Sequence, residues 1–174
     1  MGWIFTMLLQ AIKQMNAYEI FGLAPKFIID LEELRKKFIA LQLNHHPDLK
    51  SDDIESSAFI NESYNTLKDP YKRYSYLLEL IYPNNVVKLD NIWLMEMMEL
   101  NDSILESKAN ESIKPSVENS LKVYFSEVNL ALEKKAIEWD QNRQSEILKY
   151  ISLELQKIKY LQRLQKIFDG VEEL

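Results

Sequence analysis

Apolar residues between positions 30 and 43 recur at intervals of three and four, the spacing that places side chains on one face of an α-helix. They are Leu31, Leu34, Phe38 and Leu41. Asp30 precedes this stripe and Glu33 follows three residues later, as in a capping box, where each side chain accepts a hydrogen bond from the other residue's amide. The pattern predicts an amphipathic helix from Asp30 to about Leu43.

The helical pattern then stops and resumes twice. Asn44-His45-His46-Pro47-Asp48 ends the first helix, because the residue before a proline is pushed out of the α region. We expect a loop to about Asp53 and then a second amphipathic helix. The core face of that helix consists of Phe59, Ile60, Tyr64 and Leu67. Lys68-Asp69-Pro70 ends it, and a short third helix is expected from Tyr71 to about Ile81.

Tyr82-Pro83-Asn84-Asn85 is the strongest turn signal in the chain and predicts a domain boundary. Beyond it, the periodicity predicts three helices over about 91–108, 116–138 and 141–168. The connections are expected at 109–115 and around Trp139-Asp140. Because short connections make neighbouring helices antiparallel, we expect a three-helix bundle.

Two helices of this bundle carry more apolar residues than one buried face needs. In the helix from about 91, Trp93, Met97, Leu100 and Ile104 form a core stripe, and Leu94, Met98 and Leu105 form a second stripe about a third of a turn away. In the last helix, Ile147, Ile151, Leu155 and Ile158 form the core face, and Leu153, Tyr160, Leu164 and Ile167 lie off it.

The second stripe of the first bundle helix is flanked by Met95, Glu99 and Asp102. A methionine-rich apolar patch with acids beside it is typical of an adaptable binding surface. The alternative is packing, either within a wide bundle core or between two domains.

The composition favours helices throughout. The 174 residues include only three Gly and five Pro, and long stretches are rich in Leu, Glu, Lys and Gln, which lose little rotamer freedom in a helix. At 47% hydrophobic, the chain can form one ordinary core or two small ones. We therefore predict an all-α protein.

Charge and residue types exclude several functions. The net charge is −6 with acids and bases interleaved, so we expect no nucleic acid partner. The chain has no Cys, which excludes disulfides, thiolate zinc sites and cysteine ligation of an iron–sulfur cluster. Both histidines are adjacent and no Gly-rich phosphate loop occurs, so we expect no enzyme, no metal site and no cofactor.

Residues 1–14 are apolar at their start, but the apolar run is too short to span a bilayer, so we expect no membrane partner. Met15 leads directly into the patterned chain. We interpret residues 1–14 as an N-terminal extension, either a start assigned too far upstream or an extra turn, and assign it no function.

The tripeptide His46-Pro47-Asp48 becomes specific through its setting, a loop between two amphipathic helices. The first helix bears Arg35, Lys36 and Lys37, and the second runs into Asn65-Thr66-Leu67-Lys68-Asp69-Pro70-Tyr71-Lys72-Arg73. This arrangement resembles the J domain of the DnaJ superfamily, and Tyr18-Glu19-Ile20-Phe21-Gly22-Leu23 resembles the first helix of that family. The resemblance implies a helical hairpin with short flanking helices.

In J domains, the loop and the basic second helix dock on an ATPase chaperone. The resemblance therefore implies that His46, Pro47 and Asp48 contact a chaperone of the DnaK/HscA class, with steering charge from Arg35, Lys36 and Lys37. Pro47 fixes its own φ and restricts His46, which lowers the ordering cost on binding. For the three cations, the alternative is a solvated helix face offset by nearby acids.

Within the superfamily, the chain resembles the HscB type most. The matching segments are Phe21-Gly22-Leu23, Leu41-Gln42, Ile60-Asn61 and above all Tyr76-Leu77-Leu78. The resemblance implies an IscU-type iron–sulfur scaffold protein as the client. Carried over position by position, the scaffold-contact residues are Leu94, Met95, Met98, Glu99, Asp102 and Tyr160.

This resemblance implies an N-terminal extension at 1–14, a J domain at 15–82, a linker at 83–90 and a scaffold-binding three-helix domain at 91–174. We expect a bacterial cytoplasmic protein, with the mitochondrial matrix as the alternative location. The alternative function is a general J-domain co-chaperone for another client protein.

Overall fold

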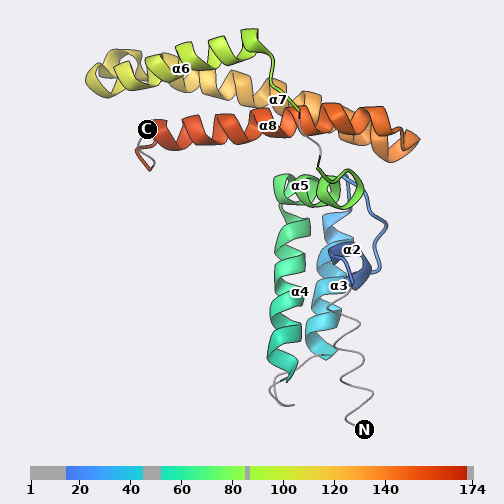
Figure 1. The fold of residues 1–174 in the computed structure, drawn as a ribbon. Coiled ribbons are helices and arrows are strands. Elements are labelled where there is room, and N and C mark those ends of the chain that lie inside the picture. The colour runs from blue at the N-terminus through green and yellow to red at the C-terminus, as the bar shows by residue number, and fades with distance from the viewer. Residues whose placement is uncertain (1–14, 45–51, 85–86, 172–174) are drawn as a thin grey trace. The chain divides into compact units, whose positions relative to one another are not determined.

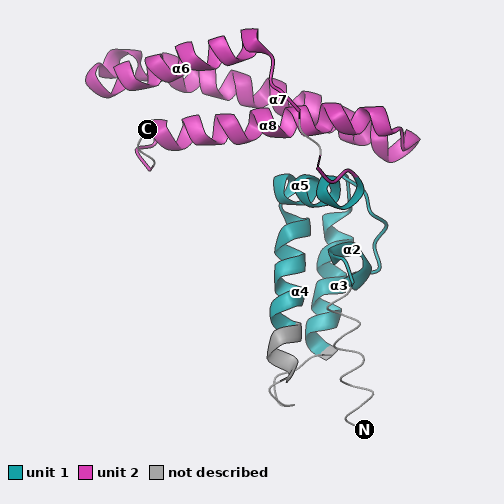
Figure 2. Ribbon diagram, in the orientation of Figure 1, with its two compact units in different colours: residues 1–81 teal, residues 82–174 magenta. Residues whose placement is uncertain are grey.

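The computed structural model describes residues 15–44, 52–84 and 87–171, and these residues form helices joined by short connections, with no strand among them (Figure 1). The chain divides into two compact units, residues 1–81 and residues 82–174 (Figure 2). The predicted all-α fold class is confirmed.

The first unit contains α2 (Ala17–Ile20), α3 (Leu31–Asn44), α4 (Asp52–Lys68) and α5 (Pro70–Ile81). Helices α3 and α4 lie side by side as a hairpin, and α2 packs against α4 (Figure 1). The fully buried side chains of this unit come from all four helices and from the loop before α3: Tyr18, Phe27, Leu34, Ile60, Leu67 and Leu77. The predicted hairpin is therefore present, closed by two shorter helices.

The start of α3 bears out half of the predicted capping box. Asp30 Oδ1 accepts hydrogen bonds from the backbone amides of Glu32 at 2.8 Å and Glu33 at 3.2 Å. The return bond from Glu33 was predicted wrongly, because its carboxylate pairs with Lys37 Nζ at 2.8 Å, one turn along the helix. Leu31 was also placed wrongly on the core face: it is 50% exposed. As the first helical residue, it lies one turn ahead of the packed part of the stripe, which begins at Leu34.

Helix α5 starts at Pro70, where a missing backbone N–H costs nothing. Asp69 Oδ1 accepts from the amide of Lys72 at 2.9 Å and so caps this helix. The predicted stop of α4 at Lys68 is confirmed. On the facing surfaces of the hairpin, the rings of Phe38 and Tyr64 stack with their centroids 4.1 Å apart.

Two side chains of α5 form hydrogen bonds to other segments of the first unit. The buried Arg73 donates from Nε to the carbonyl of Phe27 at 2.8 Å and from Nη1 to the carbonyl of Leu67. The hydroxyl of Tyr76 accepts a hydrogen bond from the amide of Ala17 at 2.9 Å. Helix α5 thus ties together the start of α2, the loop before α3 and the end of α4.

The second unit contains α6 (Asn91–Ala109), a 3₁₀ turn η1 (Glu111–Ile113), α7 (Lys114–Asn142) and α8 (Ser145–Phe168). Helices α7 and α8 form a long hairpin, and α6 packs along both (Figure 1). Asp90 caps α6 by accepting from the amides of Ile92 at 2.9 Å and Trp93 at 3.3 Å. The predicted three-helix bundle is present.

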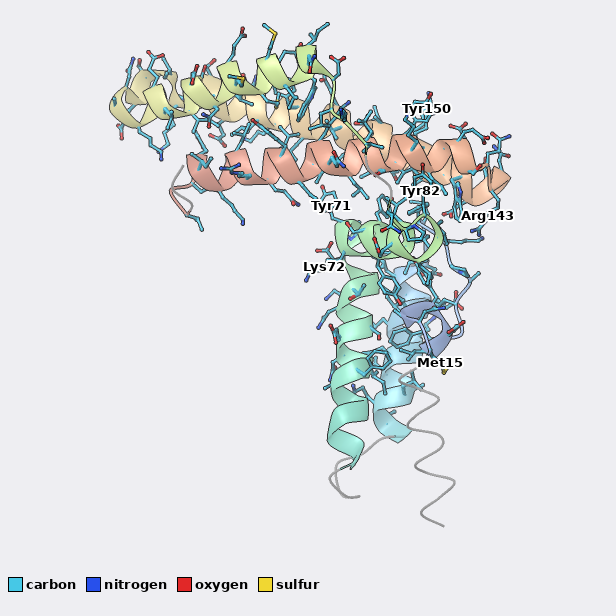
Figure 3. The ribbon with its side chains drawn as sticks, viewed as in Figure 1. Met15, Tyr71, Lys72, Tyr82, Arg143 and Tyr150 are labelled. Carbon is cyan, nitrogen blue, oxygen red and sulfur yellow. The ribbon has the colours of Figure 1, made fainter. Side chains whose placement is uncertain are left out.

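The predicted break around Trp139-Asp140 is wrong, because α7 continues to Asn142 and the chain turns at Arg143. Leu132, Ala136 and Trp139 recur at four and three, so a continuous helix buries all of them. Arg143 adopts a left-handed conformation with φ 56°. Its guanidinium lies 4.1 Å from the centre of the Trp139 ring, at the end of the hairpin (Figure 3).

Leu164 and Ile167, expected off the core face of α8, are buried. The buried residues in this half of the helix are Ile158, Leu161, Leu164 and Ile167, spaced by three. A spacing of three rotates the buried face around the helix, since a full turn takes about 3.6 residues. Helix α8 uses this rotation to pack against both α6 and α7.

Candidate functional site

The motif formed by His46, Pro47 and Asp48 lies outside the described residues. The helices on either side of it are described: α3 ends at Asn44 and α4 begins at Asp52. The predicted setting of the motif, between two helices that pack against each other, is therefore confirmed.

A polar bridge joins α3 and α4 in the half of the hairpin nearer to this motif. Gln42 Nε2 donates to Asn61 Oδ1 at 3.3 Å, and Asn61 Nδ2 donates to the carbonyl of Ser57 at 2.8 Å. The bridge links the two helices on either side of the motif segment. Sequence reasoning named Gln42 and Asn61 as matching positions but did not predict their contact.

The three cations of α3 differ in exposure and in their contacts. Arg35 and Lys36 are exposed, whereas Lys37 is half-buried. Lys37 Nζ donates to the carbonyl of Gly22 at 2.9 Å and pairs with Glu33 Oε1 at 2.8 Å. Gly22 has a φ of 54°, which glycine adopts without steric cost, and it follows the end of α2. Lys37 therefore holds the chain after α2 against α3, and the exposed charge comes from its two neighbours.

This division predicts different effects for Lys37→Ala and Lys36→Ala. Loss of the Lys37 bond to Gly22 should destabilise the first unit by about 1 kcal/mol or less, because the bond is partly exposed to water. Lys36→Ala should leave the urea midpoint unchanged. The double variant Arg35→Ala/Lys36→Ala should slow association with the chaperone and lower its salt dependence, since exposed charges act mainly on the on-rate.

Stopped-flow association at several salt concentrations, together with urea denaturation, checks both effects. Identical association rates for the parent and the double variant would place Arg35 and Lys36 on an uninvolved face. An unchanged urea midpoint for Lys37→Ala would show that its bond to Gly22 contributes no stability.

A surface of mixed apolar and acidic side chains lies on α6. We call it the α6 patch, and it consists of Leu94, Met95, Met98, Glu99 and Asp102; Tyr160 of α8, the sixth residue of the predicted scaffold contact, is half-buried. The side chains of Met95 and Met98 are 64% and 63% exposed, while Met97 between them is completely buried. Met98 of the second stripe and the flanking Met95 are therefore in solvent, whereas Leu94 and Leu105 of that stripe are half-buried.

Tyr160 contacts α6 through an aromatic pair that sequence reasoning missed. Its ring meets the ring of Trp93 edge-on, with centroids 5.5 Å apart. Lys157 Nζ lies 5.9 Å from the centre of the Trp93 ring and pairs with Glu154 Oε1 at 3.0 Å. Trp93, expected in the core stripe, is half-buried and couples α6 to α8. The sequence shows one aromatic residue on each helix, Trp93 and Tyr160, but nothing in it indicates that the two rings meet.

Acidic side chains also lie where α6 packs on α7. Slight burial raises the pKa of Tyr124 on α7, and the nearby carboxylates of Glu96, Glu127 and Glu99 raise this pKa further. Three carboxylates on two helices thus lie near one phenol, and Glu99 belongs also to the α6 patch. Glu96 and Glu127 were not among the predicted site residues, because their proximity depends on how α6 packs on α7.

Among the residues that the structure describes, no group of three or more His, Asp or Glu side chains could hold a metal ion. Nor does any helix within the described ranges have the length and apolarity needed to cross a membrane.

Comparisons with known proteins give matches to both units of the chain. Residues 16–76 match the DnaJ domain family. The chain is 30% identical over 171 residues to a co-chaperone protein HscB homolog of Vibrio atlanticus, covering 91% of this chain and 98% of that protein. It is 31% identical over 99 residues to a mitochondrial J-type co-chaperone of Saccharomyces cerevisiae, covering 52% of this chain and 54% of that protein.

Among solved structures, the chain resembles the chaperone HscB from Vibrio cholerae with a TM-score of 0.62 and 30% sequence identity. The match covers 90% of this chain and 97% of that one. Both units of the protein therefore have counterparts in a single relative.

Proposed function

The chain belongs to the HscB family of J-domain co-chaperones, and from this premise we propose that it delivers an IscU-type iron–sulfur scaffold to a DnaK/HscA-class ATPase chaperone. The first unit would stimulate the ATPase, and the second would bind the scaffold. A co-chaperone of this family is not itself an enzyme. The observation that carries the proposal is the α6 patch, where Met95 and Met98 stay exposed beside acids.

The first unit suits docking on the chaperone. Arg35 and Lys36 are exposed on α3, and their charge is available to steer an acidic partner surface. A proline fixes its own φ and restricts the residue before it, so Pro47 should lower the ordering cost when His46 and Asp48 bind. The bridge between Gln42 and Asn61 joins the helices that flank this motif.

The second unit suits capture of a folded protein. Large apolar side chains near the centre of an interface carry most of its binding energy, and Met98 with Leu94 and Tyr160 supplies them. Thioether chains adapt to the shape of a partner because they have several rotatable bonds. Glu99 and Asp102 border the apolar residues, which favours a scaffold segment that carries basic residues.

The test is steady-state ATP hydrolysis by a purified DnaK/HscA-class chaperone in the presence of the full chain. One reaction contains a purified IscU-type scaffold, and a parallel reaction contains an unfolded generic polypeptide. We expect stimulation to be greatest when the chain and the scaffold are added together. Stimulation by the unfolded polypeptide, without scaffold binding, would instead assign the protein to another client. No stimulation in either reaction would contradict the proposal.

We place the protein in the bacterial cytoplasm, as the bacterial relatives of matching length favour. The mitochondrial matrix is the alternative, which the similarity to the yeast mitochondrial co-chaperone supports.

A further inference from the structure

The methionines of α6 differ sharply in their access to solvent. The chain has six Met and no Cys, so thioethers are its only sulfur groups. Met95 and Met98 are 64% and 63% exposed, whereas Met97, between them in the sequence, is 0% exposed. Dissolved oxidants can therefore reach two methionines of this helix, whereas the third is fully buried.

Oxidation at these two positions would change the character of the α6 patch. Hydrogen peroxide transfers one oxygen atom to the lone pair of a thioether sulfur; the peroxide O–O bond breaks and water leaves. The product, methionine sulfoxide, is polar, and methionine sulfoxide reductases return it to methionine with a dithiol as the reductant; the dithiol becomes a disulfide and the oxygen leaves as water. A sulfoxide dipole at the centre of an apolar interface lacks a partner unless the client supplies a donor, and an unpaired polar group there costs binding free energy.

We infer that Met95 and Met98 form a reversible oxidation switch that releases the client when peroxide is present. This inference rests on the proposed function, because it concerns regulation of the same surface. The α6 helix itself should survive oxidation, since both side chains point into solvent and their modification leaves no cavity. Burial of Met97 protects the core of the bundle from the same reagent.

The first measurement maps the oxidised residues without any client. The full chain is treated with dilute hydrogen peroxide, the peroxide is destroyed with catalase, and peptides are examined by mass spectrometry. We expect Met95 and Met98 to gain oxygen well before Met97. Equal oxidation rates at the three positions would overturn the inference, because selective access is its basis.

The second measurement compares binding to a purified IscU-type scaffold before and after oxidation by calorimetry. Only the co-chaperone is oxidised. We expect oxidation to weaken binding at least about tenfold and treatment with methionine sulfoxide reductases to restore it. The matched control is Met95→Leu/Met98→Leu, which keeps apolar chains of similar volume and should bind equally before and after peroxide.

The outcomes separate this inference from the proposed function. If the untreated parent does not bind the scaffold, the proposed function is wrong. If the untreated parent binds and oxidation leaves its affinity unchanged, only the switch is wrong. Loss of binding by the oxidised Leu variant would also overturn the switch, because the damage would then lie at another residue.

Discussion

His46→Gln is expected to abolish stimulation of the chaperone ATPase while leaving the fold intact. Glutamine keeps a polar side chain but cannot reproduce the position of the imidazole nitrogens, and a proline restricts the backbone of the residue before it. The sequence predicts a loop at this position, and exposed loop positions contribute little to stability, so the helical signal in circular dichroism should not change. The measurement is steady-state ATP hydrolysis with the scaffold present.

His45→Gln is the matched control, because it makes the same chemical change one residue earlier and leaves the motif intact. We expect it to keep most of the stimulation. Full stimulation by His46→Gln would contradict the role of this motif in ATPase activation. Loss of helical signal in His46→Gln would show that the histidine is needed for folding.

The triple variant Leu94→Ala/Met98→Ala/Tyr160→Ala is expected to weaken scaffold binding at least about tenfold, which corresponds to about 1.4 kcal/mol. The three truncations remove large side chains from the proposed centre of the interface, where few residues carry most of the energy. Calorimetry with the purified scaffold measures this loss. The urea midpoint should change little for Met98, which is exposed, and more for Leu94 and Tyr160, which are half-buried.

A second triple variant on α7 serves as the control for nonspecific loss of apolar surface. Val123, Leu130 and Ile137 are 46%, 69% and 42% exposed and lie outside the α6 patch. Changing all three to Ala should leave scaffold affinity unchanged. A collapsed urea midpoint in the α6 variant would show that its residues are core, where large-to-Ala changes cost roughly 2–5 kcal/mol each. A preserved midpoint with unchanged affinity would place the client elsewhere.

The helices could be predicted from periodicity and punctuation, because these signals are local. Pro70 and Asp69 mark the start of α5 in the sequence, and the structure places both at that position. The end of α7 could not be predicted in the same way. No Gly or Pro marks it, and the helix continues because Trp139 gains burial against the rest of the bundle, which is a tertiary effect.

The candidate site also has one part that local sequence patterns predict and another that depends on the folded structure. Counting apolar stripes was sufficient to predict that α6 has residues beyond its core need, and Met98 is indeed exposed. Counting charges was not sufficient for α3, since Lys37 is bound to the carbonyl of Gly22, fifteen residues away in the chain. Residues that share a helix face can be recognised from sequence, whereas a bond to another segment depends on the folded backbone.

The bonds made by Arg73 decide how far the first unit could be shortened. A fragment that ended with α4 would lack α5, and the carbonyls of Phe27 and Leu67 would lose the guanidinium that now satisfies them. The amide of Ala17 would lose Tyr76 in the same step. A minimal chaperone-docking module cut from this protein must therefore extend through α5, even though the residues that would touch the chaperone all precede it.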